Sequence, residues 1–203
     1  MRKLVFVLLL FVSAVTFAKN PITVKFQESP ESMEVAGLLK LLDASQVTAT
    51  LYADSLNAKH YAIWMVEHKD GNVNRTRVGY RSIEPDSTKL TFTAVAKDSL
   101  NAYISIVDIN GAKQRETVSL PTTNHMLIGC DYEWNFNEND TIPLVAYATG
   151  IPMKYTLGSG EVVDAFYICG LRFSKIHPSR WKDEYNLSDY LYFEAIPVKE
   201  MSL

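Results

Sequence analysis

Hydrophobic and polar residues alternate with a period of two along most of the chain after residue 20, which predicts β-strands rather than helices. Short polar segments separate these stretches, and two of them contain Asp-Gly or Asn-Gly, the dipeptides typical of hairpin turns. The first 120 residues therefore predict a run of short antiparallel strands. The predicted strands are Pro21–Phe26, Gln46–Ala53, His60–His68, Val73–Ile83, Lys89–Ala96, Tyr103–Ile109 and Lys113–Leu120.

One early segment has a helical period instead. Val35, Leu38, Leu39 and Leu42 follow i, i+3, i+4, i+7 spacing, which places them on one face of a helix. Ser29 or Ser32 is a suitable N-cap in front of this segment. The pattern predicts a short helix before the second strand.

The pentapeptide DSLNA occurs twice, at Asp54–Ala58 and at Asp98–Ala102. Each copy follows the first strand of a strand–turn–strand–turn–strand unit, and Asp, Asn and Ser favour turns because their side chains bond to nearby backbone groups. The repeat predicts a duplicated half-sandwich. The expected fold is all-β, an antiparallel immunoglobulin-like β-sandwich with a second β-rich region and one or two short helices.

A polar break at Pro121–Asn124 separates the second β-rich region from the first. Strands are expected at Ile142–Ala148, across Glu161–Ile176 and near the C-terminus, with a helical turn close to Pro178. The predicted organisation is a signal peptide at 1–18 and a sandwich at 19–121. Residues 122–203 then form either a C-terminal β-rich domain or a continuation of the sandwich.

The N-terminus has the pattern of a secretory signal peptide. Arg2 and Lys3 precede the apolar run Leu4–Phe17, and Thr16 and Ala18 are small residues at the −3 and −1 positions of a cleavage site. No later segment has the length of a bilayer span, so no transmembrane segment is expected after cleavage. The sequence predicts export to the periplasm, the cell surface or the medium.

Composition narrows the choice of partner. The net charge of −3 and a pI near 5.8 argue against nucleic acid as a partner. A hydrophobic content of 47% is that of a globular protein and excludes general disorder. Cys130 and Cys169, each in an apolar stretch, form either a disulfide in an oxidising compartment or two buried free thiols.

The segment 131–141 is rich in side-chain oxygens, the ligands that calcium prefers. Calcium is the only cofactor that the sequence suggests, and a solvated hairpin loop is the alternative. The candidate ligands are Asp131, Asn137, Asn139 and Asp140.

Aromatic residues gather in the C-terminal half, where exposed rings beside polar groups form platforms on which sugar rings stack. The alternative is ordinary packing, because buried aromatics dominate core energetics. Trp134 enters a polar loop and Trp181 lies in a charged irregular segment, so these two are the best candidates for exposure. The candidate ligand-binding residues are Tyr132, Trp134, Trp181 and Tyr185.

Catalytic patterns are missing from the sequence. The four histidines show no metal-ligand spacing, and neither a Gly-x-Ser-x-Gly elbow nor a Gly-rich phosphate loop is present. No catalytic residue is predicted, and the chain is expected not to be an enzyme.

The DSLNA repeat also resembles the Asp-Ser/Thr-aliphatic motif that some Gram-negative gut bacteria O-glycosylate on exported proteins. Asp54-Ser55-Leu56, Asp98-Ser99-Leu100 and Asp140-Thr141-Ile142 match this motif. The resemblance implies Ser55, Ser99 and Thr141 as modification sites.

The segments LYADSLNAKHYAIWMVEHKDG, IPLVAYATGIPMKYTLGSGEVVDAFYICGLRF and HPSRWKDEYNLSDYLYFEAIPV resemble uncharacterised exported β-sandwich proteins of Gram-negative gut anaerobes. The resemblance implies an envelope or secreted location and a sandwich fold. The function expected is a non-enzymatic binding or accessory module of the cell envelope, with a glycan or an envelope protein as partner. The alternatives are a structural or adhesin-type interaction protein and a hydrolase whose acidic residues the sequence does not identify.

Overall fold

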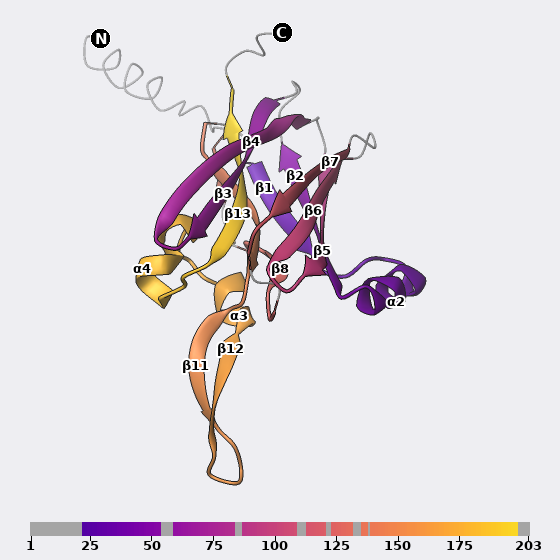
Figure 1. The fold of residues 1–203 in the computed structure, drawn as a ribbon. Helices are drawn as coiled ribbons and strands as arrows, with labels where there is room; N and C mark the ends of the chain where they lie inside the picture. The colour runs from indigo at the N-terminus through magenta and orange to yellow at the C-terminus, as the bar shows by residue number, and fades with distance from the viewer. Residues whose placement is uncertain are drawn as a thin grey trace, which may run out of the picture.

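The protein is an all-β sandwich of antiparallel sheets, as the alternation predicts (Figure 1). The computed structural model describes residues 22–53, 59–83, 87–108, 113–120, 123–131, 135–137 and 139–198. A six-stranded sheet in the order β7-β6-β5-β2-β1-β9 packs against a five-stranded sheet in the order β4-β3-β13-β10-β8. A separate hairpin, β11-β12, projects from one end.

The strands of the six-stranded sheet are β1 (Ile22–Gln27), β2 (Ala44–Ala53), β5 (Thr88–Asp98), β6 (Asn101–Asp108), β7 (Lys113–Val118) and β9 (Asn135–Phe136). Those of the five-stranded sheet are β3 (Lys59–Lys69), β4 (Asn72–Ile83), β8 (Met126–Gly129), β10 (Ile142–Ala148) and β13 (Tyr190–Pro197). The hairpin consists of β11 (Ile151–Thr156) and β12 (Val162–Tyr167). The helices are α2 (Met33–Leu41), α3 (Ile168–Arg172) and α4 (Trp181–Tyr185), with a 3-10 turn, η2, at Pro178–Arg180.

The main core fills the space between the two sheets. Inward-facing residues of β2, β5 and β6 meet those of β3, β10 and β13, and Phe92 lies 5.1 Å, centroid to centroid, from Phe193. Burial of this apolar surface is the principal force that holds the sheets together.

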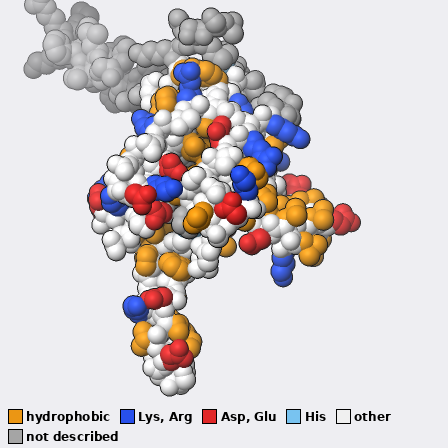
Figure 2. All heavy atoms as spheres, viewed as in Figure 1, with side chains coloured by type: hydrophobic (Ala, Val, Ile, Leu, Met, Phe, Trp, Pro, Cys, Tyr) orange, Lys and Arg blue, Asp and Glu red, His pale blue; other side chains and the backbone are white. Residues whose placement is uncertain are grey.

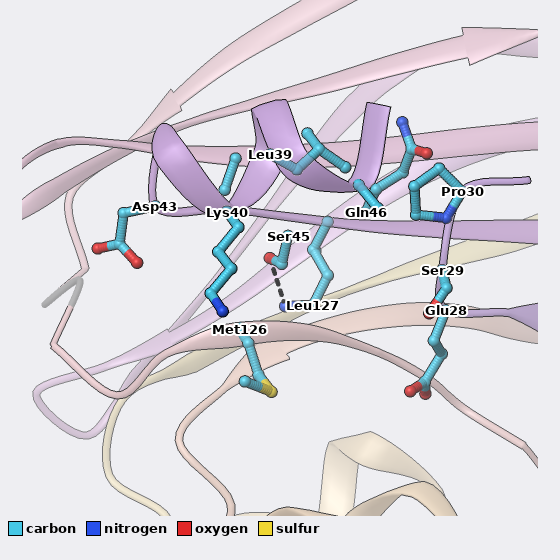
Figure 3. A pocket seen from close by; sticks show the side chains of 12 residues that line it. Glu28, Ser29, Pro30, Leu39, Lys40, Asp43, Ser45, Gln46, Met126 and Leu127 are labelled. Atoms are coloured by element: carbon cyan, nitrogen blue, oxygen red, sulfur yellow. Dashed lines mark hydrogen bonds between the residues drawn. The ribbon is translucent and has the colours of Figure 1, made fainter. Parts of the chain in front are cut away.

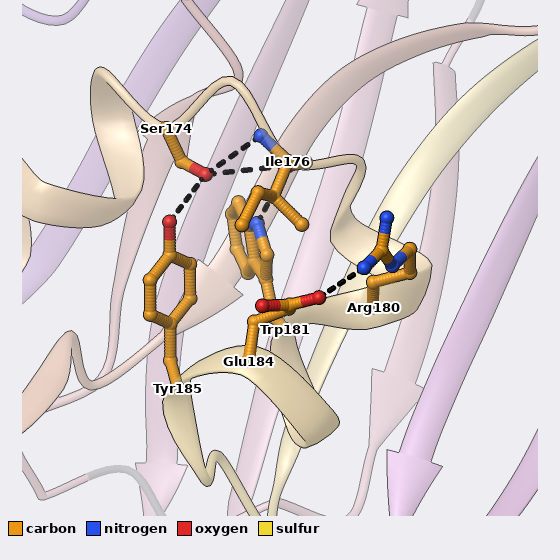
Figure 4. A network of polar contacts seen from close by, with 6 residues as sticks. All are labelled: Ser174, Ile176, Arg180, Trp181, Glu184 and Tyr185. Carbon is orange, nitrogen blue, oxygen red and sulfur yellow. Dashed lines mark hydrogen bonds and ion pairs between the residues drawn. The ribbon is translucent and has the colours of Figure 1, made fainter.

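A second core covers the outer face of the five-stranded sheet. Trp181 is fully buried there and packs on Tyr190 of β13, while its indole Nε1 donates to the carbonyl of Ile176 at 2.9 Å. The Ser174 hydroxyl lies 2.8 Å from that of Tyr185 and so ties the segment to α4 (Figure 4). The segment 168–187, which we call the helical cap, therefore makes a third layer on this sheet.

Both predicted regions contribute to the same two sheets. Of the seven strands predicted before residue 121, only β3 and β4 lie in the five-stranded sheet, and β8, β10 and β13 complete it. In return, β9 pairs with β1 of the six-stranded sheet. The strand distribution therefore differs from a seven-stranded immunoglobulin sandwich completed within the first region.

The two copies of DSLNA follow strands with different connections. After the first copy the chain changes sheets, because β2 belongs to the six-stranded sheet and β3 to the five-stranded sheet. The second copy joins β5 and β6, which pair as a hairpin within one sheet. In the second copy the Asp98 carboxylate accepts from the backbone N–H of Leu100 at 2.9 Å, which is the predicted turn geometry. Residues 54–58 lie outside the described residues. The predicted duplicated half-sandwich is wrong, because the two units differ in topology.

The described residues contain three short α-helices, one more than the upper number expected. α2 begins after Ser32, whose Oγ accepts from the Val35 N–H, and none of its residues is buried. α3 was predicted as part of a strand across Glu161–Ile176, because apolar residues continue without a polar break after β12. The chain turns there, which places Leu171 in the second core. No described helix has the length and apolar character needed to cross a membrane.

Side chains protect the outer edge of β8. The Leu127 N–H donates to Ser45 Oγ at 3.0 Å (Figure 3), and the Gly129 N–H donates to Glu28 Oε1 at 3.3 Å. These bonds satisfy backbone donors that an edge strand otherwise leaves open.

Trp181→Ala should lower the free energy of unfolding by about 3–5 kcal/mol, because it removes the largest side chain of the second core and leaves a cavity. Urea unfolding followed by circular dichroism measures the change. Phe173→Ala is the control, since that aromatic side chain is 59% exposed and its loss should change stability by less than about 0.5 kcal/mol. Equal effects of the two substitutions would contradict the packing described for the helical cap.

Candidate functional site

The best candidate site is a shallow depression of about 430 Å³ on the outer face of the five-stranded sheet. The sheet forms its floor, and the 3-10 turn of the helical cap contributes residues to one side. We call this depression the outer pocket. It is lined by Val66, His68, Val73, Arg75, Thr141, His177, Ser179, Tyr192 and Glu194.

Strand register brings most of these side chains together. His68 of β3 lies opposite Tyr190 of β13 and Val73 of β4, and Val66 lies opposite Tyr192 and Arg75. Because directly opposed residues of antiparallel strands point to the same face, these residues share one surface.

Glu194 and Arg75 form an ion pair across this surface. The Glu194 side chain is almost fully buried, whereas half of the Arg75 side chain is exposed. The Arg75 guanidinium also lies 5.3 Å from the centroid of the Trp64 ring, which is partly exposed. The pair gives the buried carboxylate the partner that it needs, and it leaves guanidinium donors at the pocket rim.

His68 is the least satisfied polar residue of the site. Its side chain stacks on Tyr190 with ring centroids 4.4 Å apart, and the residue is 5% exposed. Neither Nδ1 nor Nε2 has a hydrogen-bond partner in the part of the chain that the structure describes. Burial and, to a lesser degree, the charge of Lys182 lower the pKa of His68, while Asp183 acts in the opposite direction. The imidazole is therefore neutral at pH 7, with one donor and one acceptor unused.

His177 is the second imidazole of the pocket. Its Nδ1 lies 2.9 Å from the Ser179 hydroxyl, and its ring meets the Tyr192 ring edge to face at 5.7 Å. Burial lowers the pKa of His177 and raises that of Tyr192, so both side chains are neutral at pH 7.

This arrangement suits binding by hydrogen bonds. The lining combines two neutral imidazoles, hydroxyls of Thr141, Ser179 and Tyr192, and the paired guanidinium and carboxylate. Glu194 is the single carboxylate among the described lining residues, and it is paired with Arg75. Glycoside cleavage requires two facing carboxyl groups, which this lining does not supply.

The residues predicted for ligand binding do not form a common site. Trp181 was predicted as an exposed ring, but it is completely buried because its indole anchors the helical cap, so this prediction is wrong. Tyr185 is partly buried in the same packing, and its hydroxyl bonds to Ser174. Tyr132 and Trp134 lie outside the described residues.

The predicted calcium ligands have other contacts or remain dispersed. Asp140 accepts from the backbone N–H of Asn137 at 2.7 Å and from its side-chain amide at 2.9 Å, so this carboxylate closes a turn. Asn139 is exposed and Asp131 is partly buried. Across the described ranges, no three His, Cys, Asp or Glu side chains gather as a metal site requires.

Cys130 and Cys169 are free thiols, so the predicted disulfide is wrong, and of the two only Cys130 is the buried thiol of the second alternative, since Cys169 is partly buried. Cys130 is fully buried in the second core, and burial raises the pKa of its thiol. Of the predicted modification sites, Ser99 lies exposed in the β5–β6 turn and Thr141 is exposed at the outer pocket, while Ser55 lies outside the described residues.

The residues of the outer pocket were missed by sequence reasoning, although one signal was available. The alternation of HYAIWMVEH places Trp64, Val66 and His68 on one face of a strand. A histidine and a tryptophan on the face opposite the core residues of that strand indicate a specialised surface. The neighbours that complete the site, Tyr192 and Glu194, come from β13, and local pattern does not show that β13 pairs with β3.

Comparison of the chain with protein-family models, with curated proteins and with solved structures found no match. Function is therefore inferred from the geometry of the outer pocket.

The stability of the protein should fall as pH decreases below about 6.5, the ordinary pKa of histidine. The pKa of His68 is lower in the folded state than in the unfolded chain. Between these two pKa values the unfolded chain binds a proton that the folded protein does not, so acid favours unfolding. Urea unfolding at pH 7.5, 6.5 and 5.5 measures this slope.

His68→Phe should flatten that slope in part, leaving the contribution of His177, whose pKa is also lowered. At pH 7.5 the variant should be more stable than the wild type by about 1 kcal/mol, because a ring that can stack on Tyr190 replaces two unpartnered buried nitrogens. A less stable variant with an unchanged pH slope would show that the nitrogens of His68 have partners in solution.

Proposed function

We propose that the protein is a binding module whose outer pocket recognises a hydroxyl-rich ligand, a glycan unit in the setting of the cell envelope. The observation that carries the proposal is the buried His68 imidazole with no hydrogen-bond partner. Such a group costs free energy of about 1–3 kcal/mol, and a ligand that bonds to it recovers that cost.

The chemistry of the pocket favours a sugar over other small molecules. A neutral imidazole offers one donor and one acceptor, which is the complement of a hydroxyl group. The Thr141 and Ser179 hydroxyls extend this pattern around the pocket, and Arg75 adds charged donors at the rim. Binding through His68 requires one of its two buried ring nitrogens to turn toward the ligand in the pocket.

The shape of the pocket favours binding over chemistry. A shallow depression of about 430 Å³ receives one or two rings of a longer chain and leaves the rest of the chain in solvent. Trp64 lies beside Arg75 and Glu194 at the rim and provides an aromatic surface against which a sugar ring stacks. In this proposal Trp64 has the sugar-stacking role that was predicted from the sequence for Trp134 and Trp181.

The alternative, an interaction protein that binds another chain by strand addition, would use the outer edge of β4. This strand is 12 residues long and, among the described strands, pairs only with β3. It also carries Arg75, Arg77 and Arg81, and its pairing shifts register between Ile63 and Trp64. Charged residues and bulges are the features that block strand addition, so the pocket supports the glycan function better.

Screening on an array of neutral and acidic oligosaccharides, followed by calorimetry with the best binder, tests the proposal. His68→Phe should weaken binding of that saccharide at least tenfold, about 1.4 kcal/mol, while the variant stays folded. His60→Phe is the matched control, since His60 lies on the same strand, bonds to Ser82 and does not line the pocket.

The proposal fails if no oligosaccharide binds at millimolar concentration. It also fails if His68→Phe and His60→Phe bind the selected saccharide as tightly as the wild type does. In that case the ligand lies elsewhere on the molecule, and the orphaned imidazole has no part in recognition.

A further inference from the structure

The outward face of the six-stranded sheet carries an unusual concentration of positive charge. We call it the basic face. Its outward-facing cations come from three strands, β1, β5 and β7, and all are exposed. They are Lys25, Lys89, Lys97, Lys113 and Arg115.

Among the described residues of these strands, no carboxylate lies in the middle of this face. Glu116 of β7 is partly buried on the opposite side of the strand and accepts from Gln114. Asp98 lies at the end of β5, where its carboxylate is held by the turn. The chain as a whole has a net charge of −3, so the positive charge is local and not a property of the composition. In Figure 2 several Lys and Arg side chains gather along the right-hand side of the sandwich, above α2.

The centre of the basic face is lined by hydroxyl and amide groups in regular rows. Thr48 and Thr91 share a hydrogen bond of 3.0 Å across β2 and β5, and Gln46 donates to Thr93 at 3.2 Å. Thr93 lies opposite Ser105, which in turn lies opposite Arg115. Residues that alternate along a strand are about 6.5–7 Å apart, so cations and hydroxyls repeat at that interval.

The two outward-facing tyrosines are covered by cations. The Arg115 guanidinium lies 3.7 Å and the Lys97 Nζ lies 5.5 Å from the centroid of the Tyr103 ring, and Lys25 lies 5.1 Å from that of Tyr52. The rings are therefore already engaged in cation–π contacts.

The geometry points to an anionic polysaccharide, a chain bearing carboxylate or sulfate groups, as the ligand of the basic face. The cations complement its charges, and the ordered hydroxyls complement those of its sugar rings. A protein interface needs an apolar centre within a polar rim, and this face has a polar centre. Single-stranded nucleic acid stacks its bases on free aromatic rings, and here each of the two tyrosines already has a cation over its ring.

This inference is independent of the outer pocket. The pocket lies on the outward face of the five-stranded sheet and the basic face on that of the six-stranded sheet, so the main core separates them. Loss of one site should leave the other intact, and the two proposals can fail separately.

Binding to polygalacturonate and to dextran sulfate, with neutral dextran as a third probe, tests the inference by affinity electrophoresis or calorimetry. We expect both anionic polymers to bind and neutral dextran not to bind. Affinity should fall steeply as the salt concentration rises from about 50 to about 300 mM. Counterions are released when the protein binds the polymer, so added salt opposes association.

Substituting Lys25, Lys89 and Lys113 together by Gln should weaken binding of both anionic polymers at least tenfold. The matched control replaces Lys40, Lys154 and Lys175 by Gln, which removes the same charge from exposed positions elsewhere. Equal weakening in both variants would show that binding depends only on the net charge of the protein, and it would contradict a binding site on the basic face. Failure of either polymer to bind at 50 mM salt, or equally tight binding of single-stranded DNA, would overturn the choice of ligand.

Discussion

Strand β13 is the element on which the rest of the structure depends, because it is buried on both faces. On its inner face Leu191, Phe193 and Ala195 belong to the core between the sheets. On its outer face Tyr190 and Tyr192 belong to the core under the helical cap. A strand in the middle of a sheet with cover on both sides has no solvent face, so each of its side chains needs a partner in a packed layer.

The outer pocket follows from this double burial. The helical cap covers only part of the outer face of the five-stranded sheet. The pocket lies beside His177 and Ser179 of the cap, over the part of the sheet that the cap leaves uncovered. Tyr190 supports His68 by stacking, and Glu194 holds Arg75, so the strand that completes the core also positions the polar groups of the pocket. The binding role proposed for His68 is opposed to stability, because neither nitrogen has a hydrogen-bond partner among the described residues and a phenylalanine at this position is predicted to stabilise the fold.

Local pattern predicts what depends on neighbours in the sequence, and this covers much of the fold. Alternation located β1 to β7 and β10 to within a few residues, α2 begins after Ser32, one of the two predicted N-caps, and the DSLNA turn at Asp98 has the expected side-chain bond. Long-range pairing was not predictable, because alternation does not say which strand lies next to which. Two features of the fold depend on such pairing. The chain changes sheets between β2 and β3, and β13 lies between β3 and β10.

The same limit explains the errors about the site. Trp181 lies in a segment that is charged and irregular by sequence, and it is buried because the segment folds back onto β13. His68 and His177 seemed scattered, yet tertiary packing brings both into one pocket. Exposure of an aromatic ring or an imidazole depends on which layer covers it, and this information is in the topology rather than in the local sequence.

The most direct test of the account is a measurement on His68 itself. Two-dimensional proton–nitrogen NMR of the imidazole nitrogens, at pH 7.5 and with increasing amounts of the saccharide selected by array, reports protonation and hydrogen bonding of each ring. The account predicts a neutral His68 whose nitrogen shifts change on binding, together with those of His177, while those of His60 and His125 stay constant. A saccharide that binds without moving the His68 nitrogens, or a His68 that is already protonated at pH 7.5, would contradict it.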